Sequence, residues 1–257
     1  MILTRASIAI LAAFLSPIFA TAAAVDTRES KVLSTFEKRF AEASASVLIP
    51  RKEGGDAAAT CDLASTQMPN TSPVALPPPS TGLSLTHIAI GRGTQNYTCI
   101  DDSATPVASG AVATLFNVTC LAGPYPSLLA LLPDIALKFP TPEPSSVMSP
   151  ANLFLSGHHF FTDLTTPFFN FNTNAHEWGT VGCKKANATD APNKATDVPW
   201  LKLSSKARDG CTISEVYRLN TKGGQPPATC KGMGSQFMVQ YAAEYWFWSN
   251  PDAPAYT

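Results

Sequence analysis

The chain of 257 residues has a formal net charge of −1, only 14% charged residues and 22 prolines. Because no run of Lys or Arg could follow a phosphate backbone, the composition excludes a nucleic-acid partner. Sparse charge and frequent proline favour strands and turns over long surface helices, and the length suits one large all-β domain.

The N-terminus has the pattern of a secretory signal peptide. Arg5 supplies a positive charge, Ala6–Phe19 is apolar, and small residues follow at positions 20–24. Pro17 and the polar residues from Asp26 onward make the apolar run too short for a membrane-spanning helix. We expect a signal peptide at residues 1–22, cleaved between residues 20 and 25, and a secreted protein located outside the cell or in the cell wall, with no membrane segment in its mature form.

Two segments precede the expected β domain. Apolar residues at helical spacing in Glu29–Val47 predict an amphipathic helix. Residues 54–81 are small, polar and proline-rich, which predicts an extended arm attached through Cys61. Residues 25–82 are therefore interpreted as an N-terminal helix and arm, and residues 83–257 as the β domain.

Apolar and β-branched runs separated by Gly, Pro and Asn predict a series of strands. The first run, from Leu83, is interrupted by Gly91-Arg92-Gly93 and is interpreted as a hairpin or a long bulged strand. The later candidates are residues 112–118, 153–161, 168–172, 178–183, 200–203, 212–219 and 236–248. Residues 126–139 predict one short helix, broken at Pro133. The fold class is mostly β: a single-domain β-sandwich or closed barrel with an N-terminal amphipathic helix.

The last predicted strand places aromatic residues on both of its faces. Tyr241, Tyr245 and Phe247 share one face, which we expect in the core. Trp246 and Trp248 lie one pleat apart on the other face. They are candidates for a sugar-stacking platform, and the alternative is a second buried face under a loop.

Six cysteines fit an oxidising compartment and predict three disulfides. They are Cys61, Cys99, Cys120, Cys183, Cys211 and Cys230. No pair has the Cys-x-x-Cys spacing of zinc or redox centres. Cys183 and Cys211 lie at the ends of predicted strands that we expect to be neighbours, which favours a bond between them and leaves the other pairings open. Four sequons predict N-glycosylation at Asn70, Asn96, Asn117 and Asn187.

Standard catalytic motifs are missing from the sequence. Gly91-Arg92-Gly93 begins like a dinucleotide fingerprint, but Asn96 stands where the third glycine belongs, so a nicotinamide site is rejected and no cofactor is expected. Many carboxylates, Glu244 among them, are available for acid–base chemistry, and no pattern selects a pair of them.

The histidines supply the one candidate metal site. His158, His159, His176 and Glu177 lie within one short stretch. Because neighbours in a strand point to opposite faces, only one of the first two histidines could join His176 and a carboxylate as ligands. This region carries the alternative hypothesis of a secreted hydrolase or metal-dependent enzyme.

Three segments resemble a known secreted family. They are HIAIGRGTQNYTC (87–99), SGHHFF (156–161) and the region from PWLKL through ISEVYRLNTKGGQPPATC to VQYAAEYWFW (199–248). They are similar to the family called domain of unknown function 3455, found in filamentous fungi and bacteria, over roughly Leu83–Trp248. The resemblance implies a secreted protein whose domain spans roughly these residues. It assigns no catalytic residues to this chain. Fungal members often bear the label malate dehydrogenase, which the absence of a nucleotide-binding loop does not support.

The sequence therefore favours a secreted, glycosylated, disulfide-stabilised protein that binds a polysaccharide or another cell-wall component. Two alternatives stay open. One is the enzyme described above, and the other is a binder of a small apolar ligand inside a barrel.

Overall fold

The computed structural model describes residues 61–69, 74–141 and 154–250. All of them belong to the second of two compact units, which spans residues 57–257. The predicted signal peptide and the predicted amphipathic helix lie outside the described residues. Within the described ranges, no helix has the length and apolar character needed to cross a membrane.

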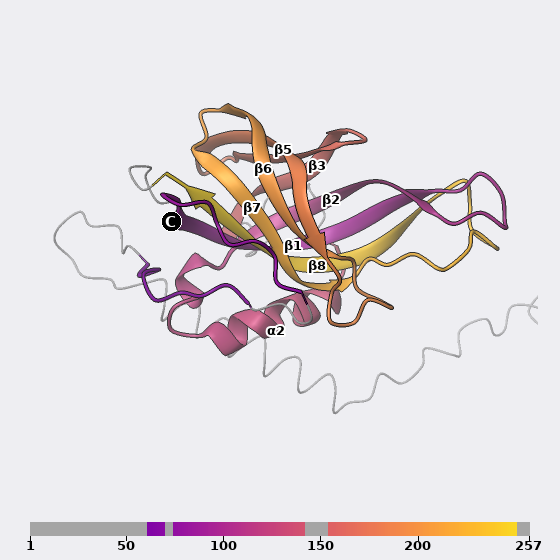
Figure 1. The fold of residues 1–257 in the computed structure, drawn as a ribbon, viewed down its shortest axis with the longest axis horizontal. Coiled ribbons are helices and arrows are strands. Elements are labelled where there is room, and N and C mark those ends of the chain that lie inside the picture. The colour runs from indigo at the N-terminus through magenta and orange to yellow at the C-terminus, as the bar shows by residue number, and fades with distance from the viewer. Residues whose placement is uncertain (1–60, 70–73, 142–153, 251–257) are drawn as a thin grey trace, which may run out of the picture. The chain divides into compact units, whose positions relative to one another are not determined.

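Eight antiparallel strands form a closed barrel in which each strand pairs with the next and the last pairs with the first (Figure 1). The closed barrel confirms one of the two predicted architectures, and the β-sandwich alternative is wrong. The strands are β1 (Ser84–Thr98), β2 (Val107–Asn117), β3 (Leu155–Asp163), β4 (Thr166–Asn172), β5 (Glu177–Thr189), β6 (Trp200–Asp209), β7 (Ile213–Gly223) and β8 (Gln236–Ser249). In the described part of the connection between β2 and β3, the chain forms two helical segments, η1 (Thr119–Leu121) and α2 (Pro126–Leu137).

The two glycines that looked like punctuation lie inside one continuous strand. A Cβ atom on Gly93 would come within 1.8 Å of the Val112 carbonyl oxygen, and one on Gly91 within 2.4 Å of the Tyr245 ring. These glycines therefore allow β2 and an interior ring to approach β1 closely. The hairpin interpretation of this segment was wrong, and the long strand was right.

Helix α2 covers the outer face of β1, β7 and β8 (Figure 1). It continues through Pro133, contrary to the predicted break, and buries Leu129 and Leu132. Arg92 points outward from β1 and donates from Nε to the Ala136 carbonyl at 2.9 Å and from Nη2 to the Phe139 carbonyl at 2.9 Å. A guanidinium at this place adds hydrogen bonds to carbonyl groups at the C-terminal end of the helix, where a positive charge is also favourable.

The interior of the barrel is filled with aromatic side chains. Alternate residues of β8 point inward, so Tyr245 and Phe247 meet Phe169 of β4 at ring-centroid distances of 5.7 and 5.6 Å. Phe171 lies 5.1 Å from Phe247. These rings are at most 1% exposed. The interior is therefore the hydrophobic core, as in other barrels of this size.

Three strand segments continue past the barrel as a protruding arm (Figure 1). The arm consists of Thr94–Thr98 of β1, Val107–Val112 of β2 and Gln236–Gln240 of β8. It forms because β7 pairs with β8 only from Tyr241 onward and β3 pairs with β2 only from Ala113 onward. The Cys99–Cys230 disulfide closes its tip.

Candidate functional site

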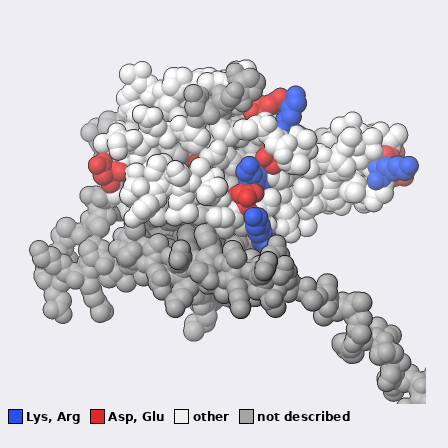
Figure 2. Space-filling model, turned by 90° about the horizontal axis from the view of Figure 1, so that it is seen from below, with Lys and Arg blue, Asp and Glu red and all other residues white. Residues whose placement is uncertain are grey.

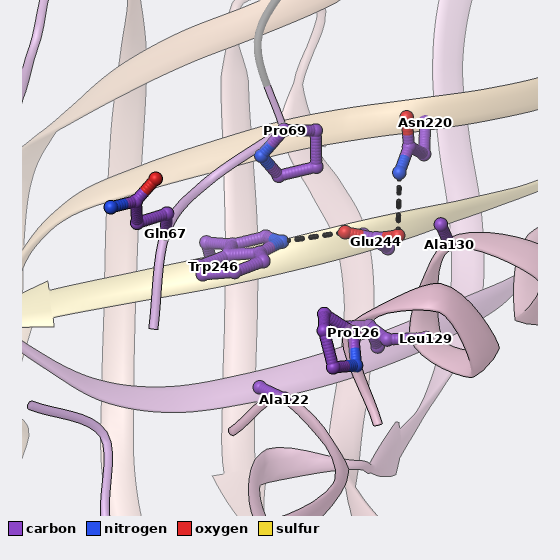
Figure 3. A pocket seen from close by; sticks show the side chains of 9 residues that line it. All are labelled: Gln67, Pro69, Ala122, Pro126, Leu129, Ala130, Asn220, Glu244 and Trp246. Carbon is purple, nitrogen blue, oxygen red and sulfur yellow. Dashed lines mark hydrogen bonds between the residues drawn. The ribbon is translucent and has the colours of Figure 1, made fainter. Parts of the chain in front are cut away.

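A cavity of about 270 Å³ lies on the outer side of β8, under α2. Figure 3 shows its side chains: Trp246 and Glu244 come from β8, Asn220 from β7, and three residues from α2. Its floor is buried, whereas Gln67, Pro126 and Ala130 at its rim are exposed. The lining residues are Gln67, Pro69, Ala122, Pro126, Leu129, Ala130, Asn220, Glu244 and Trp246.

Short side chains explain why α2 does not close this space. The outward residues of β8 near the helix include Glu244 and Trp246. The residues that face them across the cavity are Pro126 and Ala130 of α2 and Ala122, which precedes the helix. Because alanine and proline reach only a short way from the backbone, a helix that packs through Leu129 leaves a hollow beside it. The cavity walls are therefore mostly apolar.

Glu244 is the polar centre of the cavity. Its side chain is 0% exposed, and its two oxygens accept bonds from Asn220 Nδ2 at 2.7 Å and from Trp246 Nε1 at 2.8 Å (Figure 3). Burial raises the pKa of this carboxyl group to about 7, although both hydrogen bonds act to lower it. The carboxyl group therefore exchanges its proton near neutral pH.

Asn220 reaches Glu244 from an unusual backbone conformation. Its φ of 45° makes it the one non-glycine residue with a positive φ in the described part of the chain. The β7–β8 register shifts at this point, between Leu219 and Lys222. Asparagine tolerates the left-handed region better than most residues, and such conformations concentrate at functional sites. The irregular turn directs the Asn220 amide to the carboxylate.

A segment that we call the strap, residues 61–69 and 74–80, lies outside the barrel and contributes Gln67 and Pro69 to the cavity. The Cys61–Cys120 disulfide attaches its first part. In its second part, the Pro77 carbonyl accepts a bond from the Tyr217 hydroxyl at 2.8 Å. The strap therefore lies against the barrel through both of its described parts.

A buried ion pair also holds the second part of the strap. Lys202 Nζ lies 3.1 Å from a Glu215 oxygen and donates to the Pro78 carbonyl at 2.8 Å. The Ser80 hydroxyl donates to the other Glu215 oxygen at 2.6 Å. Each group of this pair has a partner on the strap, which is the condition under which buried charges are tolerated.

The two tryptophans singled out from the sequence have different surroundings. Trp246 is 1% exposed and forms part of the cavity wall. Trp248 is partly exposed, and its indole nitrogen bonds to no residue in the described ranges. A flat platform needs one solvent-exposed face on each ring, and the ring of Trp246 is buried, so Trp246 belongs to the pocket instead.

The candidate metal ligands lie in different surroundings. His159 points into the barrel and donates from Nδ1 to the Phe168 carbonyl, and burial lowers its pKa to about 4. His158 points outward, and burial lowers its pKa as well. His176 stacks on Trp178 at 3.5 Å, and Glu177 is exposed. Across residues 61–69, 74–141 and 154–250, no three potential metal ligands come together.

Two of the predicted disulfides are present: Cys61 bonds to Cys120 and Cys99 to Cys230. Cys183 and Cys211 are both buried in the core, where burial and the proximity of Cys211 raise the pKa of the Cys183 thiol to about 12. The predicted bond between these two cysteines stays a prediction.

Three of the four predicted glycosylation sites fall in the described ranges. Asn96, Asn117 and Asn187 are each partly exposed on β1, β2 and β5, and Asn70 lies outside the described residues.

The cavity can bind a ligand by its shape and can exchange one proton. Acid–base hydrolysis of a glycoside needs two carboxyl groups that face one cleft, and Glu244 is the single carboxyl group among the lining residues that the structure describes. The cavity thus offers a ligand the Glu244 carboxyl group beside apolar walls. This group accepts hydrogen bonds, and it also donates one when it is protonated.

Sequence reasoning named Glu244 as one of many available carboxylates and did not select it. A usable signal was present, because Glu244 is the lone acidic residue within the apolar run 237–248. Asn220 also lay within ISEVYRLNTKGGQPPATC, one of the segments that carry the family resemblance. Its role depends on the backbone turn, which the sequence does not show.

Residues 79–249 match the model of the family described as Protein of unknown function (DUF3455). The chain belongs to this family. The match covers the whole barrel, including Asn220, Glu244 and Trp246. No curated protein and no solved structure matches the chain significantly.

Proposed function

We propose that this member of the family is a secreted, N-glycosylated binding protein, acting outside the cell or in the cell wall, whose Glu244 cavity holds one neutral sugar residue. The observation that carries the proposal is a fully buried carboxyl group at the floor of a mostly apolar cavity with an exposed rim. Buried titratable groups of this kind concentrate at functional sites.

Secretion is supported by the signal-like N-terminus together with two disulfides in the barrel unit. Disulfides persist in oxidising compartments and are rare in the cytosol. One of them attaches the strap, which lines the cavity, and the other closes the arm. The compartment and the architecture therefore support each other.

The size of the cavity suits a small ligand. Its volume of about 270 Å³ lies just below the range of about 300–1,000 Å³ that is usual for drug-sized ligands. A sugar ring has apolar C–H faces and a rim of hydroxyl groups. The walls formed by Trp246 and Leu129 fit the faces, and the Glu244 carboxyl group fits a hydroxyl.

The charge of the site favours a neutral ligand. No Lys or Arg lines the cavity among the described residues, and the raised pKa keeps part of the Glu244 population uncharged at neutral pH. A neutral carboxyl group both donates and accepts a hydrogen bond, which is what a sugar hydroxyl requires. An anionic ligand would meet no opposite charge in this cavity.

Retention of the purified, deglycosylated protein on insoluble chitin, β-glucan, cellulose and whole fungal cell wall tests this function. We expect retention on one polymer and its loss in Ala130→Phe, which places a ring at the rim of the cavity. Leu131→Phe is the matched control, because residue 131 is 57% exposed on the same helix and does not line the cavity. Failure on every polymer, or equal loss in both variants, would contradict the proposal.

A further inference from the structure

In the protruding arm, β8 is an edge strand of the sheet. Its outer edge has no partner strand in the described part of the chain. Gln236–Gln240 pair with Thr94–Thr98 of β1 on one side. On the other side β7 begins to pair only at Tyr241, and no backbone bond from a described loop reaches these five residues. Backbone N–H and C=O groups on this edge can therefore receive another extended strand.

The five residues of this edge carry none of the features that usually protect an exposed strand, and the predicted glycosylation site Asn96 lies beside Met238 on β1. Natural edges carry charged residues, prolines or bulges. Gln236–Gln240 contain no charge and no proline, and their register with β1 is regular. Met238 is 69% exposed on it. Figure 2 shows the arm as a largely uncharged surface with charged side chains at its end.

The sequence of the edge is symmetric about Met238. Read in either direction, it runs glutamine, apolar residue, methionine, apolar residue, glutamine. In an antiparallel pair of two such edges, Met238 lies opposite its own copy, Gln236 opposite Gln240, and Phe237 opposite Val239. A two-fold axis requires this kind of self-complementary surface. Because the edge has no charge, two copies do not repel each other.

We propose that two copies of this chain associate through antiparallel pairing of Gln236–Gln240, which joins the two arms into one continuous sheet. The contact uses backbone hydrogen bonds, cross-strand glutamine pairs and the two Met238 side chains. It lies on the arm, away from the Glu244 cavity, so it does not depend on the function proposed above.

A cysteine cross-link at the symmetry axis tests the pairing directly. Opposite residues of an antiparallel pair have Cα atoms about 4.5–5.5 Å apart, which suits a disulfide. Met238→Cys should therefore give a covalent dimer on a non-reducing gel. Gln240→Cys is the control, because its two copies would lie roughly 13 Å apart along the strands. Equal cross-linking of both variants, or none in Met238→Cys, would overturn the proposal.

Sedimentation velocity at increasing concentrations of the intact secreted protein gives the second readout. We expect the unmodified chain to reach twice the monomer mass and Met238→Lys to stay monomeric, because two lysines would face each other across the axis. Val112→Lys, at 51% exposure on the β2 side of the arm, should leave the dimer intact. A monomer at every concentration, or a dimer that survives Met238→Lys, would refute the pairing.

Discussion

The inside of the barrel and the outer side of β8 are both buried, but they are packed differently. Inside, the rings of Phe169, Tyr245 and Phe247 meet one another across the barrel. Outside, Glu244 and Trp246 lie under α2 beside a cavity of about 270 Å³. A barrel of this size is filled by its own side chains, so the space for a ligand arises where a helix covers the outside.

The same physical effect acts in both regions with opposite results. Burial lowers the pKa of His159 inside the barrel to about 4 and raises the pKa of Glu244 outside it to about 7. In each case, loss of water disfavours the charged form. His159 is locked among rings, stacked on Phe169 at 4.5 Å, whereas Glu244 lines a cavity that a ligand can enter.

The largest expected effect is on stability, from removing the outer tryptophan. Trp246→Ala should lower the free energy of unfolding by about 4 kcal/mol, because it empties a buried site and deprives Glu244 of one donor. Trp248→Ala, at a partly exposed position on the same strand, should cost clearly less. Urea denaturation measures both, and equal losses would show that the outer face of β8 is packed uniformly.

The pH dependence of stability tests the buried carboxyl group. The raised pKa of Glu244 means that the folded state binds this proton more tightly, so its contribution to stability is present below about pH 4.5 and falls as the pH rises to about 7. The total change is about 3 kcal/mol. Glu244→Gln should remove this contribution, so that only the opposite effect of the buried His159 remains and the stability measured by denaturation rises from pH 4.5 to 7.

The exposed Glu177 provides the control for that profile. Glu177→Gln should leave its shape unchanged. Identical shapes for Glu244→Gln and the unmodified protein would mean that the carboxyl group is not the one that titrates.

The interior histidine should have the opposite effect in the same range. The lowered pKa of His159 means that its contribution is present above about pH 6.5 and is lost as the pH falls to about 4, again by about 3 kcal/mol. In the unmodified protein the two slopes nearly cancel. His159→Phe should therefore unfold with a stability that rises on acidification from pH 7 to 4.5.

The adjacent residue His158 is a matched control for this variant, because it is only partly buried. His158→Phe should change the slope less than His159→Phe does. A larger change at His158 would contradict the assignment of the acid-sensitive group to the barrel interior.

The smallest expected effect concerns the strap. Tyr217→Phe removes the hydroxyl that donates to the Pro77 carbonyl at 2.8 Å and should lower stability by about 1 kcal/mol. Proteolysis within the strap, followed by mass spectrometry, should become faster while cleavage of the barrel does not. Unchanged proteolysis would mean that this bond does not hold the strap.

Alternating apolar residues were sufficient to predict most of the strands, and the fold class followed from them. Gly91 and Gly93 left a hairpin open beside the correct long strand, because a glycine that lets another strand approach looks, in sequence, like a glycine in a turn. Pro133 was misread because a proline can lie inside a helix when its neighbours pack well. Both cases concern contacts between segments far apart in the chain.

The candidate site was harder to predict, for the same reason. Its members come from the strap, α2, β7 and β8, so no local pattern contains them. The pKa of Glu244 depends on burial beneath other segments, and the position of Asn220 depends on a positive φ. Trp246 was identified from its strand, but only the packing of α2 and the strap decides that it lines a pocket.

The indole N–H of Trp246 is the most direct probe of the central claim, because it donates to Glu244 at the floor of the cavity. Of the four tryptophans in the chain, it is the one that lines the cavity. In ¹H–¹⁵N spectra, titration with the monosaccharide of the retained polymer should shift this resonance saturably, and Ala130→Phe should abolish the shift. Binding that shifts another indole and leaves Trp246 unchanged would contradict the account.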